Sequence, residues 1–473
     1  MNITISPKGL AGEIIIPASK SHTIRALLIA TLAKGDSIVA NPLDSQDARS
    51  CIEACRAFGS TIEELSDGWS GYPRALKVKG IGDNPNGILH KAPSNVIDVG
   101  NSGTTEYLAA GIAALCPQTT VFTGDHQIRN RPVENLLAAL RDLGAKAYST
   151  RDNGKAPFIV QGPITGGTTS IECPTSQYLS SLMIALPLAQ GTSEIHVPLL
   201  YEQPYAEMTA RWLEDQGIQF FNDHWKKLTI PGGQTYNPFR KAVPGDFSSA
   251  TFFAVAAAIT GSTLTLSGLD MADSQGDKAV FLYLSIMGCR VDYLMGDALV
   301  SQAASTSGDD LEDCTQAYNA ACSQGTDRIR ITGPSKSGRP LRGGRFDLNA
   351  TPDALPAMAV AGCFAIGRVE LYNVAQARLK ETDRIKVMKT ELTKMGASIT
   401  ETDDGLIIEP GTKAPGESPL RGADVEGWDD HRVVMSLAVA GLMAQGSTTI
   451  HGAEAAGVTF PNFFELLDSH GVG

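Results

Sequence analysis

Cationic side chains stand where an apolar helix should begin. Lys20 and Arg25 lie in the first turns of residues 18–35, an apolar segment that is expected to form a helix. The N-terminal end of a helix is already electropositive, so cations placed there are unfavourable unless an anion lies among them. The two cations therefore suggest a site for an anionic group. A solvated first turn capped by Ser19 would explain the same residues equally well.

Two further segments repeat this arrangement. Arg131 directly precedes Pro132, a residue that suits the first position of a helix. In residues 377–388, Lys380 and Arg384 are spaced i, i+4 and would share one face of a helix. An ordinary ion-paired surface helix would show the same spacing.

A fourth segment places Arg432 at the start of an apolar helix, directly after Asp429, Asp430 and His431. The carboxylates are expected to cap that helix, and His431 to orient its loop rather than to carry a proton. Helix capping does not explain why Arg432 follows these carboxylates. Because the whole chain has a formal net charge of −12, cations gathered in this way imply a ligand with more than one anionic group, such as a phosphate and a carboxylate.

Other expected helix starts carry neutral polar residues or a single carboxylate. Gly103 ends a Gly-Asn-Ser-Gly turn whose backbone N–H groups could approach an anion closely, although such turns more often only cap a helix. Thr175, Ser176 and Gln177 lead a second apolar run, and Asp353 leads a third. A single motif of this kind does not indicate a functional site, but the recurrence of polar residues at several helix starts does.

The elements that must position these residues follow a repeated pattern. Six segments each contain a glycine, a β-branched run, a polar loop and an apolar periodic helix that ends at a glycine, and they span 35–59, 119–144, 191–217, 261–288, 367–396 and 446–471. The final glycines suit left-handed C-cap positions. The spacing of roughly 75 residues suits a small βαβ-type unit. Six units predict two domains of three units each. One domain comprises residues 1–19 and 245–473, and the other comprises residues 20–244. Residues 301–345 are rich in Ser, Gly and Asp, which predicts that part of this segment is an inserted surface excursion.

Composition excludes several classes of function. The chain has 473 residues, of which 42% are hydrophobic and 19% charged, as in a soluble globular protein. Its negative charge argues against nucleic acid or an anionic membrane as partner. The eight cysteines form no C-x-x-C pair and no metal-ligand spacing, so most are expected to be small buried residues. Without a recognisable targeting segment, a cytoplasmic location is expected.

Several stretches also match a known family. They are PASKSHTIRALLIA, GNSGTT, RNRPVENLLAAL, TSQYLSSLMIALPLA, QPYAEMT, PGDFSSATFFAVAAA, PDALPAMAVA, RLKETDRIKVM and DDHRVVMSLAVA, in this order over nearly the whole chain. In these stretches the chain resembles the 5-enolpyruvylshikimate-3-phosphate synthases.

The resemblance implies a fold and a reaction. The fold is a two-domain inverse α/β architecture, each domain built of three βαβαββ units, with helix N-termini facing an interdomain cleft that holds the active site. The reaction transfers the enolpyruvyl group of phosphoenolpyruvate to the 5-hydroxyl of shikimate 3-phosphate and releases phosphate, in the shikimate pathway to the aromatic amino acids. The resemblance further implies a monomer that needs no metal or organic cofactor, in a family that glyphosate inhibits.

The same resemblance assigns residues to the two substrates. Those expected to hold shikimate 3-phosphate are Lys20, Ser21, Arg25, Thr175, Ser176, Gln177, Tyr205, Asp353, Gln376 and Lys380. Those expected to hold phosphoenolpyruvate are Lys20, Gly103, Arg131, Gln177, Arg384 and Arg432. Asp353 would take the proton of the 5-hydroxyl, Glu381 would protonate the methylene carbon and later remove a proton, and Lys20 would stabilise the departing phosphate.

The chain departs from the family pattern at a few positions. Tyr107 stands where many members have arginine, and Val458 where many have lysine, so two cations near the phosphoenolpyruvate side are missing. Glu202 and Gln203 replace a Ser-Lys or Ser-Arg pair, and Gln376 stands where asparagine is common.

Two alternatives remain at this stage. The sister enzyme that transfers enolpyruvate to UDP-N-acetylglucosamine usually has a cysteine in the loop represented here by TGDHQIRNRP, and an Ala-Lys-Asn-Ala motif where this chain has Ser-Lys-Ser. A non-catalytic phosphate-binding protein on the same fold would have no need of Asp353, Glu381 and Lys20, all of which are present. A P-loop nucleotide binder is excluded because the chain has no G-x-x-x-x-G-K-[ST] motif.

Overall fold

The chain divides into two compact units. In the computed structural model, which describes residues 1–82, 94–304, 311–334, 340–410 and 418–472, one unit comprises Met1–Pro17 and Gly245–Gly473 and the other Ala18–Pro244. We call them the terminal unit and the inserted unit. The chain passes between the units twice, at residues 17–18 and 244–245. The two connecting segments are joined by backbone hydrogen bonds, in which Ser19 N–H donates to Pro244 O at 2.8 Å and Asp246 N–H to Pro17 O at 2.9 Å.

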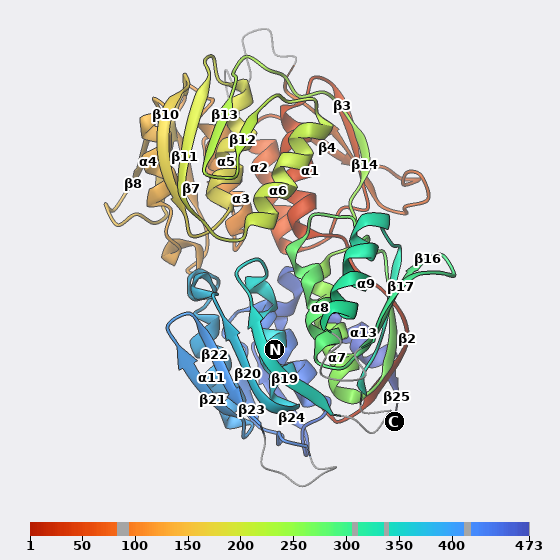
Figure 1. Cartoon of the computed structure of the whole chain (residues 1–473). Coiled ribbons are helices and arrows are strands. Elements are labelled where there is room, and N and C mark those ends of the chain that lie inside the picture. Colours follow the sequence, from red (N-terminus) through yellow and green to blue (C-terminus); the bar gives the residue numbers. More distant parts are fainter. Residues whose placement is uncertain (83–93, 305–310, 335–339, 411–417, 473) are drawn as a thin grey trace. The chain divides into compact units, whose positions relative to one another are not determined.

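The inserted unit contains three four-stranded sheets with two helices each (Figure 1). The first sheet has the order β14(Arg240–Ala242), β3(Asp36–Ala40), β5(Ala75–Lys79), β4(Thr61–Glu64), with α1(Lys20–Leu32) and α2(Gln46–Ala57). The second has the order β6(Val96–Asp98), β7(Thr120–Thr123), β9(Phe158–Gln161), β8(Lys146–Ser149), with α3(Gly103–Ala113) and α4(Glu134–Asp142). The third has the order β10(Gly167–Cys173), β11(Ser193–Leu200), β13(Lys227–Ile230), β12(Phe221–Asp223), with α5(Gln177–Ala185) and α6(Gln203–Asp215).

The terminal unit also contains three sheets. One has the order β19(Leu341–Asp347), β20(Ala365–Tyr372), β22(Gly405–Glu409), β21(Ser398–Thr402), with α10(Leu355–Cys363) and α11(Arg384–Lys394). Another has the order β1(Asn2–Ile5), β24(Thr448–His451), β23(Asp424–Glu426), with α12(His431–Gly441) and α13(Phe463–Ser469). The largest has the order β17(Ala298–Ala304), β16(Arg290–Met295), β18(Arg328–Thr332), β15(Thr263–Ser267), β2(Gly9–Ile15), β25(Gly471–Val472), with α7(Phe247–Thr260), α8(Ala279–Ile286) and α9(Leu311–Gln324).

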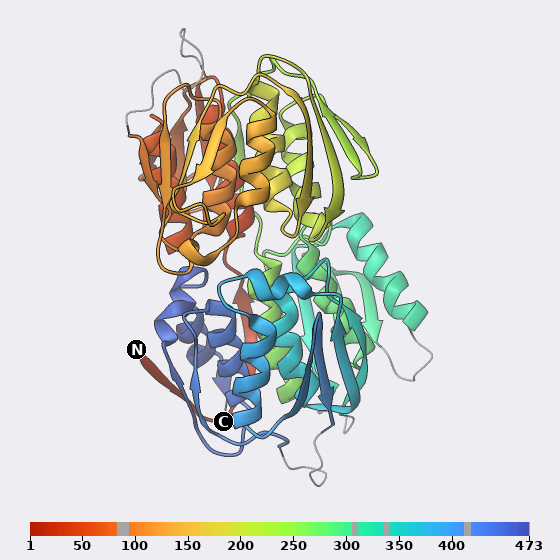
Figure 2. The ribbon, with the colours of Figure 1, turned by 90° about the vertical axis from the view of Figure 1, so that its left-hand side faces the viewer.

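The most deeply buried helices lie inside each unit. Among the described residues of each unit, three inner helices are apolar on nearly every side and pack on one another: α1, α3 and α5 in the inserted unit, and α7, α10 and α12 in the terminal unit. Figure 2 shows helices that lie between the sheets within each unit. A helix that is apolar all round must be buried on every side. Such helices expose only their ends, and their polar first turns are the segments that the sequence singled out.

The sheets repeat one connection. In four of them a strand, an inner helix and a second strand come in this order along the chain, and the two strands pair in parallel, as when β6 pairs with β7 across α3. The other two parallel pairs flank the points at which the chain passes from one unit to the other. β3 follows the first of these points and pairs with β14, which precedes the second. β2 precedes the first point and pairs with β15, which follows the second. Six sheets among the described residues, three in each unit, confirm the α/β architecture predicted from the six-fold pattern.

The helix ends test the sequence predictions in detail. Five of the final glycines, at positions 59, 144, 217, 288 and 396, have φ between 73° and 109°, which confirms their left-handed backbone. The prediction for Gly471 is wrong, because this residue begins β25 and lies opposite Leu10 of β2. The excursion predicted within 301–345 is confirmed only in part: the described residues include α9, but also the end of β17, all of β18 and most of β19.

Two composition-based expectations can also be assessed. All eight cysteines are free thiols, and all but the partly buried Cys322 lie in the interior, as expected. Among the described residues, no helix has both the length and the hydropathy to cross a bilayer.

Candidate functional site

Arg25 is a buried cation whose hydrogen-bond acceptors are all neutral. It lies in α1 and is 1% exposed. Its Nε donates to Thr209 Oγ1 at 2.8 Å, Nη1 to Ser21 O at 3.0 Å, and Nη2 to Tyr205 O at 3.1 Å and Ser180 Oγ at 3.3 Å. Burial lowers the pKa of Arg25 to about 10, against an opposing effect of Tyr205. Among the described residues Arg25 has no acidic partner, so its environment favours a bound anion.

Lys20 begins α1 and faces a carboxylate. Its Nζ lies 3.2 Å from Asp47 Oδ2 on α2, and both side chains are largely buried. Ser19 caps the helix by accepting from His22 N–H at 3.4 Å, as the sequence predicted. An anionic ligand at Lys20 must therefore compete with Asp47.

The start of α5 brings hydroxyl groups against a glutamate. Glu202 is buried in a left-handed conformation with φ of 57°, and its Oε2 accepts from Thr175 Oγ1 at 3.3 Å and lies 3.5 Å from Ser176 Oγ. Gln177 Oε1 is buried and has no hydrogen-bond partner among the described residues. Buried acceptors of this kind normally have a partner, so a donor on a bound ligand would complete this site.

Gly103 and Arg131 lie against each other. Gly103 is the first residue of α3, and a Cβ added to it would collide with Arg131 Nη1 and stand 3.3 Å from Arg131 Cζ. Glycine therefore allows the guanidinium to rest on the first turn of α3. The predicted helix start at Pro132 is wrong by two residues, because α4 begins at Glu134 and Arg131 follows the short 3-10 helix η1(Ile128–Asn130).

In the terminal unit, Arg384 lies at the centre of a carboxylate cluster. Its Nε and Nη2 donate to the two oxygens of Asp430 at 2.8 and 3.2 Å, Nη1 to Asp353 Oδ1 at 2.7 Å, and Nη2 to Glu381 Oε2 at 2.5 Å. Burial alone would lower the pKa of Arg384, but the three carboxylates outweigh it and raise this pKa above its usual value. The cluster therefore holds Arg384 firmly charged.

Arg432 extends the same cluster. Its Nη2 lies 2.8 Å from Asp353 Oδ2, and its Nη1 donates to Ser248 Oγ at the start of α7. Asp430 caps α12 by accepting from Arg432 N–H at 2.9 Å, so one carboxylate orients both arginines. Burial opposes the charge of Arg432, while Asp353 and other nearby carboxylates raise its pKa.

Two further predicted residues, Gln376 and Lys380, belong to the same unit. Gln376 Nε2 donates to Asn349 O at 3.0 Å, and its buried Oε1 has no hydrogen-bond partner among the described residues. The prediction that Lys380 and Arg384 share one face of a helix is wrong, because η6(Ala375–Leu379) ends before Lys380 and α11 begins only at Arg384, with Asp383 as its cap.

Some residues of these clusters were not expected from sequence. Asp430 was expected only to cap a helix, and no role was expected for Asp47, yet they pair with Arg384 and Lys20. Glu106, in the first turn of α3, was overlooked although it is fully buried. A single carboxylate within the apolar run GTTEYLAAGIAAL was the available signal.

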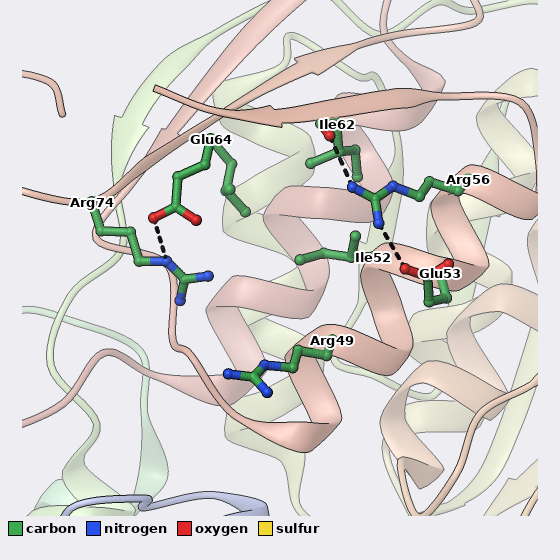
Figure 3. A pocket seen from close by; sticks show the side chains of 8 residues that line it. Arg49, Ile52, Glu53, Arg56, Ile62, Glu64 and Arg74 are labelled. Atoms are coloured by element: carbon green, nitrogen blue, oxygen red, sulfur yellow. Dashed lines mark hydrogen bonds and ion pairs between the residues drawn. The ribbon is translucent and has the colours of Figure 1, made fainter. Parts of the chain in front are cut away.

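Figure 3 shows a pocket of about 290 Å³ elsewhere on the inserted unit, over α2, β4 and β5. Three arginines line it, and each has an acidic partner. Arg56 donates to Glu53 at 2.7 Å and Arg74 to Glu64 at 3.1 Å (Figure 3), and Arg49 donates to Asp44 at 3.0 Å. It contains none of the predicted site residues. Because each of its arginines already has an acidic partner, whereas Arg25 has only neutral acceptors, it is a weaker anion site than Arg25.

Two units of three sheets, with buried guanidiniums at helix starts in both, define an α/β enzyme that handles anionic substrates. The family model of EPSP synthase (3-phosphoshikimate 1-carboxyvinyltransferase) matches residues 5–467. The 3-phosphoshikimate 1-carboxyvinyltransferase of Acetivibrio thermocellus is 47% identical over 471 residues, with 100% of this chain and 98% of the relative covered. That of Ruminiclostridium cellulolyticum is 46% identical over 471 residues, with 100% and 99% covered.

The solved structure of EPSP synthase from Acinetobacter baumannii has a TM-score of 0.76 and 28% identity, and the match covers 99% of this chain and 98% of that one. The chain belongs to the EPSP synthase family. It is a 3-phosphoshikimate 1-carboxyvinyltransferase by class, an enzyme of the shikimate pathway, as the sequence predicted.

Proposed function

We propose that the residues predicted from the sequence are the ones with which this enzyme moves the enolpyruvyl group of phosphoenolpyruvate onto the 5-hydroxyl of shikimate 3-phosphate. The observation that carries the proposal is the environment of Arg25, a fully buried guanidinium with only neutral acceptors. A phosphate dianion supplies the charge that this environment lacks.

Each substrate has its own set of residues. For shikimate 3-phosphate the set is Lys20, Ser21, Arg25, Thr175, Ser176, Gln177, Tyr205, Asp353, Gln376 and Lys380. For phosphoenolpyruvate it is Lys20, Gly103, Arg131, Gln177, Arg384 and Arg432. The unpartnered oxygens of Gln177 and Gln376 support these assignments, because substrate hydroxyl groups can donate to both.

The two catalytic carboxylates share one guanidinium. Asp353 takes the proton of the 5-hydroxyl while that oxygen bonds to C2 of phosphoenolpyruvate, and Glu381 gives a proton to C3, forming a tetrahedral intermediate. Glu381 then takes a proton back from C3 as the C2–O bond to phosphate breaks. Contact with Arg384 at 2.5 Å favours the ionised form of a carboxylate, whereas an acid must carry a proton. The substrate anion therefore activates Glu381 when it draws Arg384 away.

The test is the Arg25→Met variant, assayed by phosphate release with each substrate varied in turn. We expect the KM for shikimate 3-phosphate to rise about 100-fold, since a buried charge-assisted contact contributes about 2–3 kcal/mol, and the KM for phosphoenolpyruvate to change little. Arg25→Lys should recover part of the loss. Arg49→Met removes an exposed arginine of the same unit and is the matched control. An unchanged KM for shikimate 3-phosphate in Arg25→Met would refute the assignment.

We also propose that the chain acts as a monomer in the cytoplasm. Each unit has a hydrophobic core of its own, and all eight thiols are free, as is usual in a reducing compartment. Light scattering during gel filtration tests the first point, and fractionation of cells the second. A stable dimer, or activity in an extracellular fraction, would contradict them.

A further inference from the structure

Glu106 is a carboxyl group buried inside the inserted unit. It lies in the first turn of α3, is 1% exposed, and neither of its side-chain oxygens has a hydrogen-bond partner among the described residues. An ionised carboxylate in such a place is costly, whereas the neutral acid is tolerated.

Arg131 lies on the same face of α3 as Glu106. The guanidinium of Arg131 rests where a Cβ of Gly103 would stand. Glu106 follows Gly103 by three residues, and residues spaced i, i+3 are neighbours on a helix surface. The positive charge of Arg131 acts on Glu106 directly, which agrees with this placement.

Ionisable groups of neighbouring elements lie around this turn. Asp125 from the loop after β7 and Tyr178 from α5 interact with Glu106, and Cys51 of α2 lies beside Thr105. Cys51 in turn faces Asp47 of α2, which pairs with Lys20 of α1, and Tyr107 of α3 packs edge-on against Tyr178. Burial raises the pKa of Glu106 to about 8, Arg131 opposes this rise, and Asp125 adds to it. Asp125 is held by the backbone N–H groups of Gln127 and Ile128 at 2.9 and 3.0 Å.

We propose that Glu106 is a positioning residue for Arg131, and that its protonation sets the alkaline limit of phosphoenolpyruvate binding. As the neutral acid, Glu106 leaves the charge of Arg131 for the substrate. As the carboxylate, it draws the guanidinium toward α3 and offsets its charge. The inference rests on the proposed role of Arg131 in holding phosphoenolpyruvate.

The experiment is the pH dependence of KM for both substrates, between pH 6.5 and 9.5, in the wild-type enzyme and in Glu106→Gln. In the wild type we expect the KM for phosphoenolpyruvate to rise about tenfold from pH 7 to pH 9, as for a group that ionises near pH 8. In Glu106→Gln this rise should disappear, while the pH profile of kcat and the KM for shikimate 3-phosphate stay as in the wild type. Glu106→Met is a second variant that cannot ionise, in case the amide disturbs the core.

Two controls separate the possible failures. Glu134→Gln changes an exposed glutamate of α4 and should keep the wild-type profile. Arg131→Met should raise the KM for phosphoenolpyruvate at every pH and remove the alkaline rise. If Arg131→Met leaves that KM unchanged, the proposed site is wrong. If Arg131→Met raises it but the profiles of wild type and Glu106→Gln coincide, the role of Glu106 is refuted and the proposed function stands.

Discussion

The two units treat their buried arginines in opposite ways. In the inserted unit, Arg25 has four hydrogen bonds to hydroxyl and carbonyl oxygens, and burial lowers its pKa to about 10. In the terminal unit, Arg384 contacts three carboxylates, which raise its pKa in spite of equal burial.

The difference lies in the source of the counter-charge. Arg25 has only neutral acceptors, so the phosphate that we propose it binds would supply the missing negative charge. Arg384 is neutralised by the carboxylates that we propose to move protons, so a substrate anion would have to displace them. On this proposal one unit is prepared for binding and the other for chemistry.

The largest expected effect concerns the carboxylates of the terminal unit. If Glu381 moves protons, Glu381→Gln should lower kcat about 10²- to 10⁴-fold while both substrates still bind. Single-turnover kinetics and direct binding of shikimate 3-phosphate measure this. Glu401→Gln changes a partly exposed glutamate of the same unit and is the control. If the variant keeps most of its kcat, Glu381 does not move protons and serves only as a counter-ion of Arg384.

Stability compares the two arginines directly. Arg384→Met removes the cation that three carboxylates share, of which Asp353 alone keeps a described cationic partner in Arg432, and we expect it to lower the free energy of unfolding by about 3–5 kcal/mol. Arg25→Met removes a cation that has no acidic partner among the described residues, so it should change stability by less than about 1 kcal/mol. Urea denaturation of the ligand-free enzyme measures both. Equal losses would show that the two environments do not differ as described.

Glu106 makes stability depend on pH within the inserted unit. The folded protein keeps its proton up to about pH 8, whereas the unfolded chain releases it near pH 4.5. The unfolded state thus binds fewer protons between these values, and this group lowers stability as the pH rises. From pH 5 to pH 8 the wild type should lose about 3 kcal/mol relative to Glu106→Gln. Parallel curves of unfolding free energy against pH would contradict the raised pKa.

The smallest effect is expected at Glu202. Its carboxylate lies beside the hydroxyl groups of Thr175 and Ser176, where it would repel the substrate phosphate. Glu202→Ser should lower the KM for shikimate 3-phosphate about three- to tenfold, a gain of roughly 1 kcal/mol. Glu214→Ser alters an exposed glutamate of the same helix and should have no such effect. A higher KM in Glu202→Ser would mean that Glu202 helps to form the site.

Local signals in the sequence predicted most of the helix starts. Ser19 and Asp430 cap α1 and α12, as predicted, through bonds to backbone N–H groups that lie three and two residues away. The errors at Pro132 and Lys380 arose where short 3-10 helices precede α4 and α11 and delay their start. Whether such a turn continues into a helix depends on packing, which spacing alone does not reveal.

The sequence by itself determined the six-fold pattern and the family, because these depend on local periodicity and on motifs. The residues that it assigned to the two substrates stay a prediction. Only the tertiary structure decided which cations have carboxylate partners. Arg384 donates to Asp430, which lies 46 residues away in the sequence, and Arg25 donates to Thr209, which lies 184 residues away. The energy of a charge depends on its burial and on the distance to its neighbours, and the fold sets both. Lys20 and Arg25 look alike in sequence, yet folding gives Lys20 a carboxylate partner and Arg25 only neutral acceptors.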